Sequence, residues 1–107
     1  MQKRIYLLST LLPVLGFLFA APAFSAEADL VKAEKVYKRS CATCHGKQGE
    51  KPAMGESKII NQLKPEEIST ALSERKAGNI TGAGSPAKQR LSEQDIHNLS
   101  EYIQTLK

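Results

Sequence analysis

Cys41-Ala42-Thr43-Cys44-His45 is the stretch that decides how the rest of this chain is interpreted. A C-x-x-C-H pattern is typical of covalent attachment of c-type haem. Two thiols at this spacing can add to the two vinyl groups of one porphyrin, and the adjacent imidazole then lies beside the iron. The motif therefore predicts one haem c bonded through Cys41 and Cys44, with His45 as the proximal iron ligand.

Two other uses of these residues have less support. A thioredoxin-like redox pair occurs in a βαβ context that the sequence lacks, and a disulfide would give the neighbouring His45 no role. A zinc site needs more ligands, and the only other histidine is the distant His97. The haem interpretation is the one that uses all three side chains.

The N-terminus has the pattern of a secretory signal peptide. A basic start is followed by an apolar run from Ile5 to Ala21 and then by small residues, which fit cleavage before Ala26 or before Asp29. We expect residues 1–25 to be the signal and residues 26–107 the mature domain, exported to the periplasm. The alternative is a retained membrane anchor facing the periplasm, but the run is at the short end of the roughly 20 residues that a membrane span needs.

Size and charge limit what the mature domain can be. Roughly 80 residues form one domain near the lower size limit for a self-sufficient core, so a buried haem would supply apolar bulk. Of fifteen basic residues, Lys3 and Arg4 leave with the signal, and the remaining thirteen face eleven acidic ones for a net charge of +2. This small excess does not indicate a nucleic-acid partner.

Two helices are expected in the first part of the domain. In one, apolar and small side chains share an arc that leads directly into the haem motif. That arc consists of Leu30, Ala33, Val36, Tyr37, Ser40 and Cys41. The next helix is expected from Lys64-Pro65 to Gly78, with proline and carboxylates in its first turn. Its narrow buried stripe is Ile68, Ala71 and Leu72.

A third helix has the clearest start signal. Ser92-x-x-Asp95 resembles a capping box, and Leu91 is placed to pack against Ile96. No segment alternates apolar and polar residues with a period of two, so no strand is predicted. The expected fold class is therefore all-α. The apolar arc of this helix is Ile96, Leu99, Tyr102, Ile103 and Leu106.

From residues 41–46 and the order of the helices, the mature chain resembles a small class I cytochrome c, a bacterial periplasmic monohaem protein. The resemblance implies three main helices wrapped around one covalently bound haem. It also implies that the first and last helices cross, so that the arc of Leu30 and Tyr37 meets the arc of Leu99 and Ile103. A further implication is that the carbonyl of Pro52 holds the proximal imidazole and tunes the iron.

The sixth iron ligand departs from the family pattern. The family normally carries a methionine in the loop before the last helix, and by register from Leu91 it is expected near Gly84, yet residues 78–88 contain none. Met54 is a weak candidate, because the family places its loop on the proximal side, where a flexible thioether fills space. His97 is expected at the surface.

Two side chains near the last helix remain possible as ligands. Lys88 and Asn79 could each reach the iron, and spacing favours neither.

Two functions follow from these features. The first is outer-sphere electron transfer by a monomer between a donor and an acceptor protein. Basic side chains at Lys47, Lys51, Lys58 and Lys88 could steer acidic partners. The alternative is a haem protein that binds or senses a small ligand at an open or unusual sixth site. No second constellation of acid, base or nucleophile is visible, so an enzyme is not expected.

Overall fold

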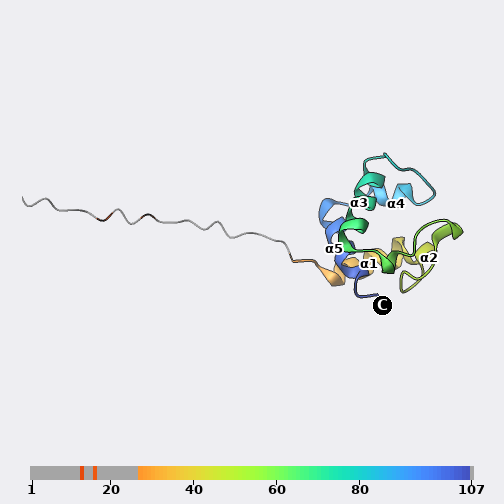
Figure 1. The fold of residues 1–107 in the computed structure, drawn as a ribbon, viewed down its shortest axis with the longest axis horizontal. Helices are drawn as coiled ribbons and strands as arrows, with labels where there is room; N and C mark the ends of the chain where they lie inside the picture. Colours follow the sequence, from red (N-terminus) through yellow and green to blue (C-terminus); the bar gives the residue numbers. More distant parts are fainter. Residues whose placement is uncertain (1–12, 14–15, 17–26, 107) are drawn as a thin grey trace, which may run out of the picture.

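The computed structural model describes residues 13, 16 and 27–106. The expected signal peptide, residues 1–25, lies outside the described residues except at positions 13 and 16. The expected all-α class is confirmed, because the described part of the chain contains helices and no strand. In chain order the elements are α1 (Leu30–Ser40), α2 (Ala42–His45), the 3₁₀ turns η1 (Ala53–Gly55) and η2 (Ile60–Gln62), α3 (Pro65–Lys76), α4 (Ser85–Gln89) and α5 (Glu93–Ile103) (Figure 1).

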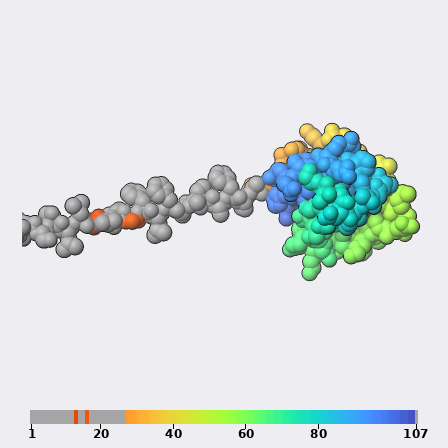
Figure 2. All heavy atoms as spheres, turned by 90° about the horizontal axis from the view of Figure 1, so that it is seen from above, coloured from red at the N-terminus to blue at the C-terminus, as the bar shows by residue number. Residues whose placement is uncertain are grey.

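The core lies where α1 and α3 pack against α5. Tyr37 on α1 is 1% exposed, and its ring lies 5.6 Å from that of Tyr102 on α5, centroid to centroid, at an interplanar angle of 54°. Tilted aromatic pairs at this separation are attractive beyond the area they bury. The expected crossing of the first and last helices is thus present, and Figure 2 shows α5 in blue beside the start of α1 in orange. The buried apolar residues are Ala33, Tyr37, Ile68, Leu91, Ile96, Leu99, Ile103 and Leu106.

The helix starts follow the sequence signals. The Ser92 hydroxyl accepts from the Asp95 amide and the Asp95 carboxylate accepts from the Ser92 amide, both at 3.0 Å, which completes the expected capping box. Leu91 and Ile96 are both buried, as the hydrophobic staple requires. At the start of α3, Glu67 accepts a 2.8 Å hydrogen bond from the Lys64 amide. These bonds satisfy amides that a helix cannot pair internally.

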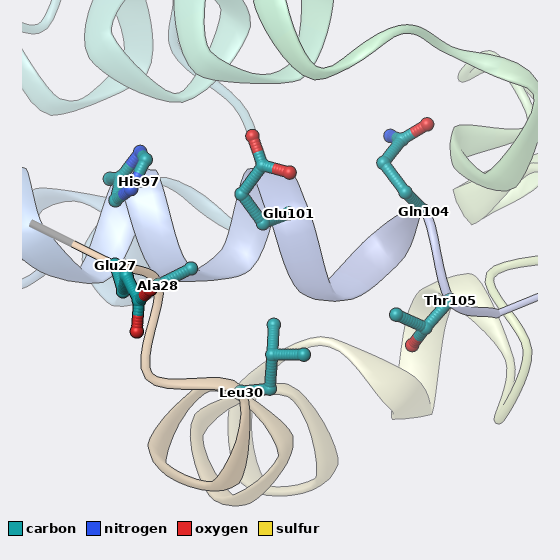
Figure 3. Close-up of a pocket in the computed structure, with 7 residues that line it drawn as sticks. All are labelled: Glu27, Ala28, Leu30, His97, Glu101, Gln104 and Thr105. Atoms are coloured by element: carbon teal, nitrogen blue, oxygen red, sulfur yellow. The ribbon is translucent and has the colours of Figure 1, made fainter. Parts of the chain in front are cut away.

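Two expectations about the buried surface were wrong in detail. Leu30, expected on the buried arc, is 42% exposed, because it begins α1 and faces an open groove beside α5 that is also lined by His97 and Glu101 (Figure 3). On α3 only Ile68 is fully buried, whereas Ala71 and Leu72 are half-buried. No helix among residues 27–106 is long and apolar enough to cross a membrane.

A buried amide ties the start of α1 to α5. Asn98 is 1% exposed, and its Oδ1 accepts from the Asp29 amide at 3.0 Å and from Nε2 of Gln94 at 2.8 Å. Burying such a polar group is costly unless it is hydrogen-bonded. The two bonds fix where the domain begins relative to its last helix.

Candidate haem-binding site

The haem motif forms a single turn at the end of α1. The Cys41 amide donates to the Tyr37 carbonyl at 2.8 Å, and the Cys41 carbonyl accepts from the Cys44 amide at 3.2 Å and the His45 amide at 3.0 Å. Residues three and four apart lie on the same face of a helix. The structure therefore brings the three predicted site residues Cys41, Cys44 and His45 together on one face.

Both cysteines are free thiols. Cys44 is exposed, whereas Cys41 is partly buried, and burial raises the pKa of its thiol to about 11. A disulfide is therefore absent from the motif. Among residues 27–106 there is also no group of three or more His, Cys, Asp or Glu side chains that could hold a bare metal ion. Neither alternative use of the motif finds support.

His45 is half-buried, and its Nδ1 is a buried atom without a hydrogen-bond partner. The expected bond from this nitrogen to the Pro52 carbonyl is not made, and that carbonyl accepts from the Gly55 amide at 2.9 Å where η1 begins. Burial, followed by the charges of Lys88 and Arg75, lowers the pKa of His45. A lowered pKa favours the neutral imidazole, which is the form that binds metals.

The residues after His45 are fixed by Tyr37 and a glycine. The Tyr37 hydroxyl donates a buried 2.6 Å hydrogen bond to the Gly46 carbonyl. Gly46 has φ +84°, and a Cβ there would lie 2.3 Å from the Glu50 carboxylate. That carboxylate accepts from the Gln48 amide at 2.8 Å. Position 46 therefore favours glycine for its backbone conformation, and a larger residue would also displace the Glu50 carboxylate.

The segment expected as a loop contains α4, which packs on α3. Ser85 is buried and its hydroxyl accepts from the Gly82 amide at 2.7 Å, which fixes the turn before α4. Lys88 on α4 is half-buried, and its Nζ lies 2.8 Å from where a Cβ on Gly84 would be. Burial, then the charge of Arg75 on α3, lowers the pKa of Lys88. Lys88 was a possible ligand from its place in the sequence, but no sequence pattern predicted this placement on α4.

The other possible sixth ligands lie in less suitable places. Met54 is 77% exposed, with φ +58°, and its turn η1 contacts α2. Asn79 is exposed, and its Nδ2 donates to Glu74 at 3.1 Å. His97 is exposed on α5, as expected, beside the groove of Figure 3.

These observations fit a covalently bound haem. Two free thiols on one helical turn match the two vinyl groups of a porphyrin, and a neutral imidazole with an unpaired buried nitrogen adjoins them. Unpaired buried polar atoms are rare in native proteins and call for an explanation such as a missing ligand. The turn has the donor set that haem c requires.

Comparison with known proteins identifies the family. The cytochrome c family profile matches residues 30–107. The chain is 43% identical over 74 residues to cytochrome c-553 of Helicobacter pylori (strain ATCC 700392 / 26695), covering 68% of this chain and 77% of that protein. It is 36% identical over 91 residues to cytochrome c-554(547) of Halothiobacillus neapolitanus, covering 74% of this chain and 98% of that protein. The chain belongs to the cytochrome c family.

Proposed function

We propose that this cytochrome carries single electrons between periplasmic redox proteins, with His45 as the proximal ligand of its haem iron. As a family member it is a monohaem c-type electron carrier that binds haem c through cysteines. Cys41 and Cys44 are the only cysteines in the sequence. When bound, the haem supplies the Fe(II)/Fe(III) couple, and the protein orients it and sets its surroundings.

The single observation that carries the proposal is the turn formed by residues 41–45. Hydrogen bonds from the Cys44 and His45 amides to the Cys41 carbonyl hold the two sulfurs and the imidazole on one face. The Tyr37 hydroxyl anchors the next carbonyl, that of Gly46. In the folded domain, a turn fixed at both ends presents its three donors to one haem.

Electron transfer also requires that a partner can approach. Cys44 is exposed, so the porphyrin edge bonded to it is expected within reach of another protein. Lys47, Lys51 and Lys58 follow the motif and are also exposed, which supports docking of partners with acidic surfaces. Lys88 does not belong to this basic surface, since it is half-buried.

Export and monomeric action are parts of the same proposal. The predicted signal peptide supports a periplasmic location. The thioether bonds of haem c form outside the cytoplasm, in this oxidising compartment. A carrier of this kind needs no second subunit to complete the site, because all three donors come from one turn. The comparisons give no support to the alternative of a small-ligand sensor.

The test begins with the purified holoprotein. We expect the haem to remain on the chain through acid–acetone extraction and denaturing gels, and a redox titration to reveal one haem that takes up one electron per chain. His45→Ala should abolish stable holoprotein, whereas the matched control His97→Ala, at the other histidine, should leave it intact. Extraction of all haem into the organic phase, or normal holoprotein from His45→Ala, would contradict the proposal.

A further inference from the structure

We propose that Nζ of Lys88 is the second axial ligand of the haem iron. The inference rests on the proposed function, in which His45 supplies the first. It follows from how α4 places Lys88, from the absence of a side chain at Gly84, and from the positions of the other possible ligands.

The backbone of α4 directs Lys88 back over Gly84. The Lys88 amide donates to the Gly84 carbonyl at 3.3 Å, so the two residues are one helical turn apart. Side chains on a helix lean toward its N-terminus, and a residue therefore covers the position four before it. Pro86 in the first turn and the Ser85 hydroxyl bonded to the Gly82 amide fix the start of this short helix.

Gly84 supplies the space that the amine occupies. A Cβ at this position would lie 2.8 Å from Nζ and 3.6 Å from Cε of Lys88. The first distance is too short for a real contact, so any larger residue at position 84 would displace the Lys88 amine. Gly84 has φ −86°, a value that any residue adopts, so its backbone does not require glycine, and what the missing Cβ provides is room for the Lys88 amine in this position.

The amine lies beside the haem-binding turn. Lys88 interacts electrostatically with this turn: its charge contributes to lowering the pKa of His45, and Cys41 and Cys44 oppose the lowering of the pKa of Lys88. The Lys88 side chain is half-buried, and the neutral form of its amine has the lone pair that ligation requires. In Figure 1, α4 lies above and α2 below, on the same side of the pair formed by α1 and α5.

The other donors are held elsewhere. Met54 is 77% exposed on a turn that packs on α2, the element that carries His45. Asn79 is exposed and bonded to Glu74, and His97 lies on α5 beside the open groove. Among these candidates, Lys88 alone combines partial burial with a position next to the attachment turn.

The first experiment records near-infrared magnetic circular dichroism and electron paramagnetic resonance of the ferric holoprotein. We expect a low-spin iron with two nitrogen ligands. Lys88→Ala should convert it to a high-spin or water-ligated form, and Lys88→Arg should do the same, because a guanidinium keeps the charge but has no lone pair to give. The matched control Lys58→Ala, at an exposed lysine, should leave the spectra unchanged.

The ferrous form gives a second readout. Loss of an internal ligand raises the fraction of iron that is open to carbon monoxide, so Lys88→Ala should bind it at least about tenfold faster than the wild type and Lys58→Ala. Equal rates in all three proteins would contradict the proposal.

A gain-of-ligand variant tests the geometry at Gly84. In Gly84→Met/Lys88→Ala the amine no longer blocks position 84, and a thioether can take its place. We expect the near-infrared sulfur-to-iron band to appear and the potential to rise above that of the wild type. This variant stays informative if Lys88→Ala alone is poorly stable.

The outcomes separate the two proposals. Wild-type spectra in Lys88→Ala or Lys88→Arg, with the haem still covalently attached, would overturn the role of Lys88 and leave the carrier proposal standing. Haem that is lost from the wild-type chain on extraction would overturn the carrier proposal itself.

Discussion

The hydroxyl of Tyr37 donates a 2.6 Å hydrogen bond to the carbonyl of Gly46, the residue that follows His45. The same ring packs against Tyr102 on α5. One side chain thus joins the α1–α5 contact to the haem-binding turn, so the stability of the helices and the geometry of the site are physically coupled.

Removal of this hydroxyl should destabilise the holoprotein. Tyr37→Phe removes one of two donors to the buried Gly46 carbonyl, which also accepts from the Gly49 amide at 3.2 Å, and the lost hydrogen bond costs about 0.5–1.5 kcal/mol. Guanidinium denaturation followed by haem absorbance measures the change. The matched control is Tyr102→Phe, at a half-buried ring, which should stay within about 0.5 kcal/mol of the wild type. Equal effects of the two changes would contradict the role assigned to the Tyr37 hydroxyl.

Tyr37 should also make stability fall at alkaline pH. Burial raises the pKa of Tyr37 to about 12 from its ordinary value of 10.0. Above the ordinary value the unfolded chain loses this proton while the folded chain keeps it, so stability falls by about 1.4 kcal/mol per pH unit until the folded pKa is passed. Below the ordinary value the contribution is complete. Unfolding curves collected across this range should show the decline, and the decline should be smaller in Tyr37→Phe.

The core position of Leu99 predicts a large effect of truncation. Leu99 is 1% exposed, so Leu99→Ala should cost on the order of 2–5 kcal/mol through lost burial and the cavity left behind. Val31→Ala is the control, because Val31 is 66% exposed on α1 and should change stability by less than about 0.5 kcal/mol. A small effect at Leu99 would show that the buried face of α5 has been misassigned.

Without haem the domain should lose its fixed tertiary structure. Its size is close to the minimum for a self-sufficient core, and the packing of the haem against the helices exists only in the folded state. Cys41→Ala/Cys44→Ala should therefore show reduced far-ultraviolet circular dichroism and no cooperative thermal transition. A sharp, native-like melt of this haem-free variant would refute the expectation.

The exposed position of Met54 predicts that its sulfur does not reach the iron. The ferric protein should lack the weak near-infrared sulfur-to-iron band, and its potential should lie below those of methionine-ligated relatives. Met54→Ala should change neither property. A sulfur band in the wild type that disappears in Met54→Ala would make Met54 the ligand.

The parts of the fold that were predicted depend on local signals. The helical periodicity of α1, the Lys64-Pro65 start of α3 and the Ser92 capping box are local signals, and each predicted its helix, although Leu30 and Ser40 of the predicted α1 arc are exposed. The haem motif was equally local. Its three donors adjoin in the chain, so sequence alone was enough to bring them to one turn.

The features that were missed depend on contacts between distant segments. α4 has five residues, which is too short for a periodic pattern, and it packs on α3. Its Lys88 acquires its position from the space at Gly84. Burial of Asn98 depends on the amide of Asp29, 69 residues earlier, and no periodicity in α5 alone could reveal it.

The bond between Asp29 and Asn98 also determines where anything joined to this domain must leave it. The amide of Asp29 is held against α5 at the start of α1, whereas the thioether-forming turn begins where α1 ends, about 16 Å away along an eleven-residue helix. A segment preceding Glu27 therefore attaches at the opposite end of α1 from Cys44. A tether at this position would hold the domain at the end of α1 that lies opposite the haem-binding turn. The haem would then stay accessible to partners, so a fusion partner or surface linker at the N-terminus should not slow electron exchange.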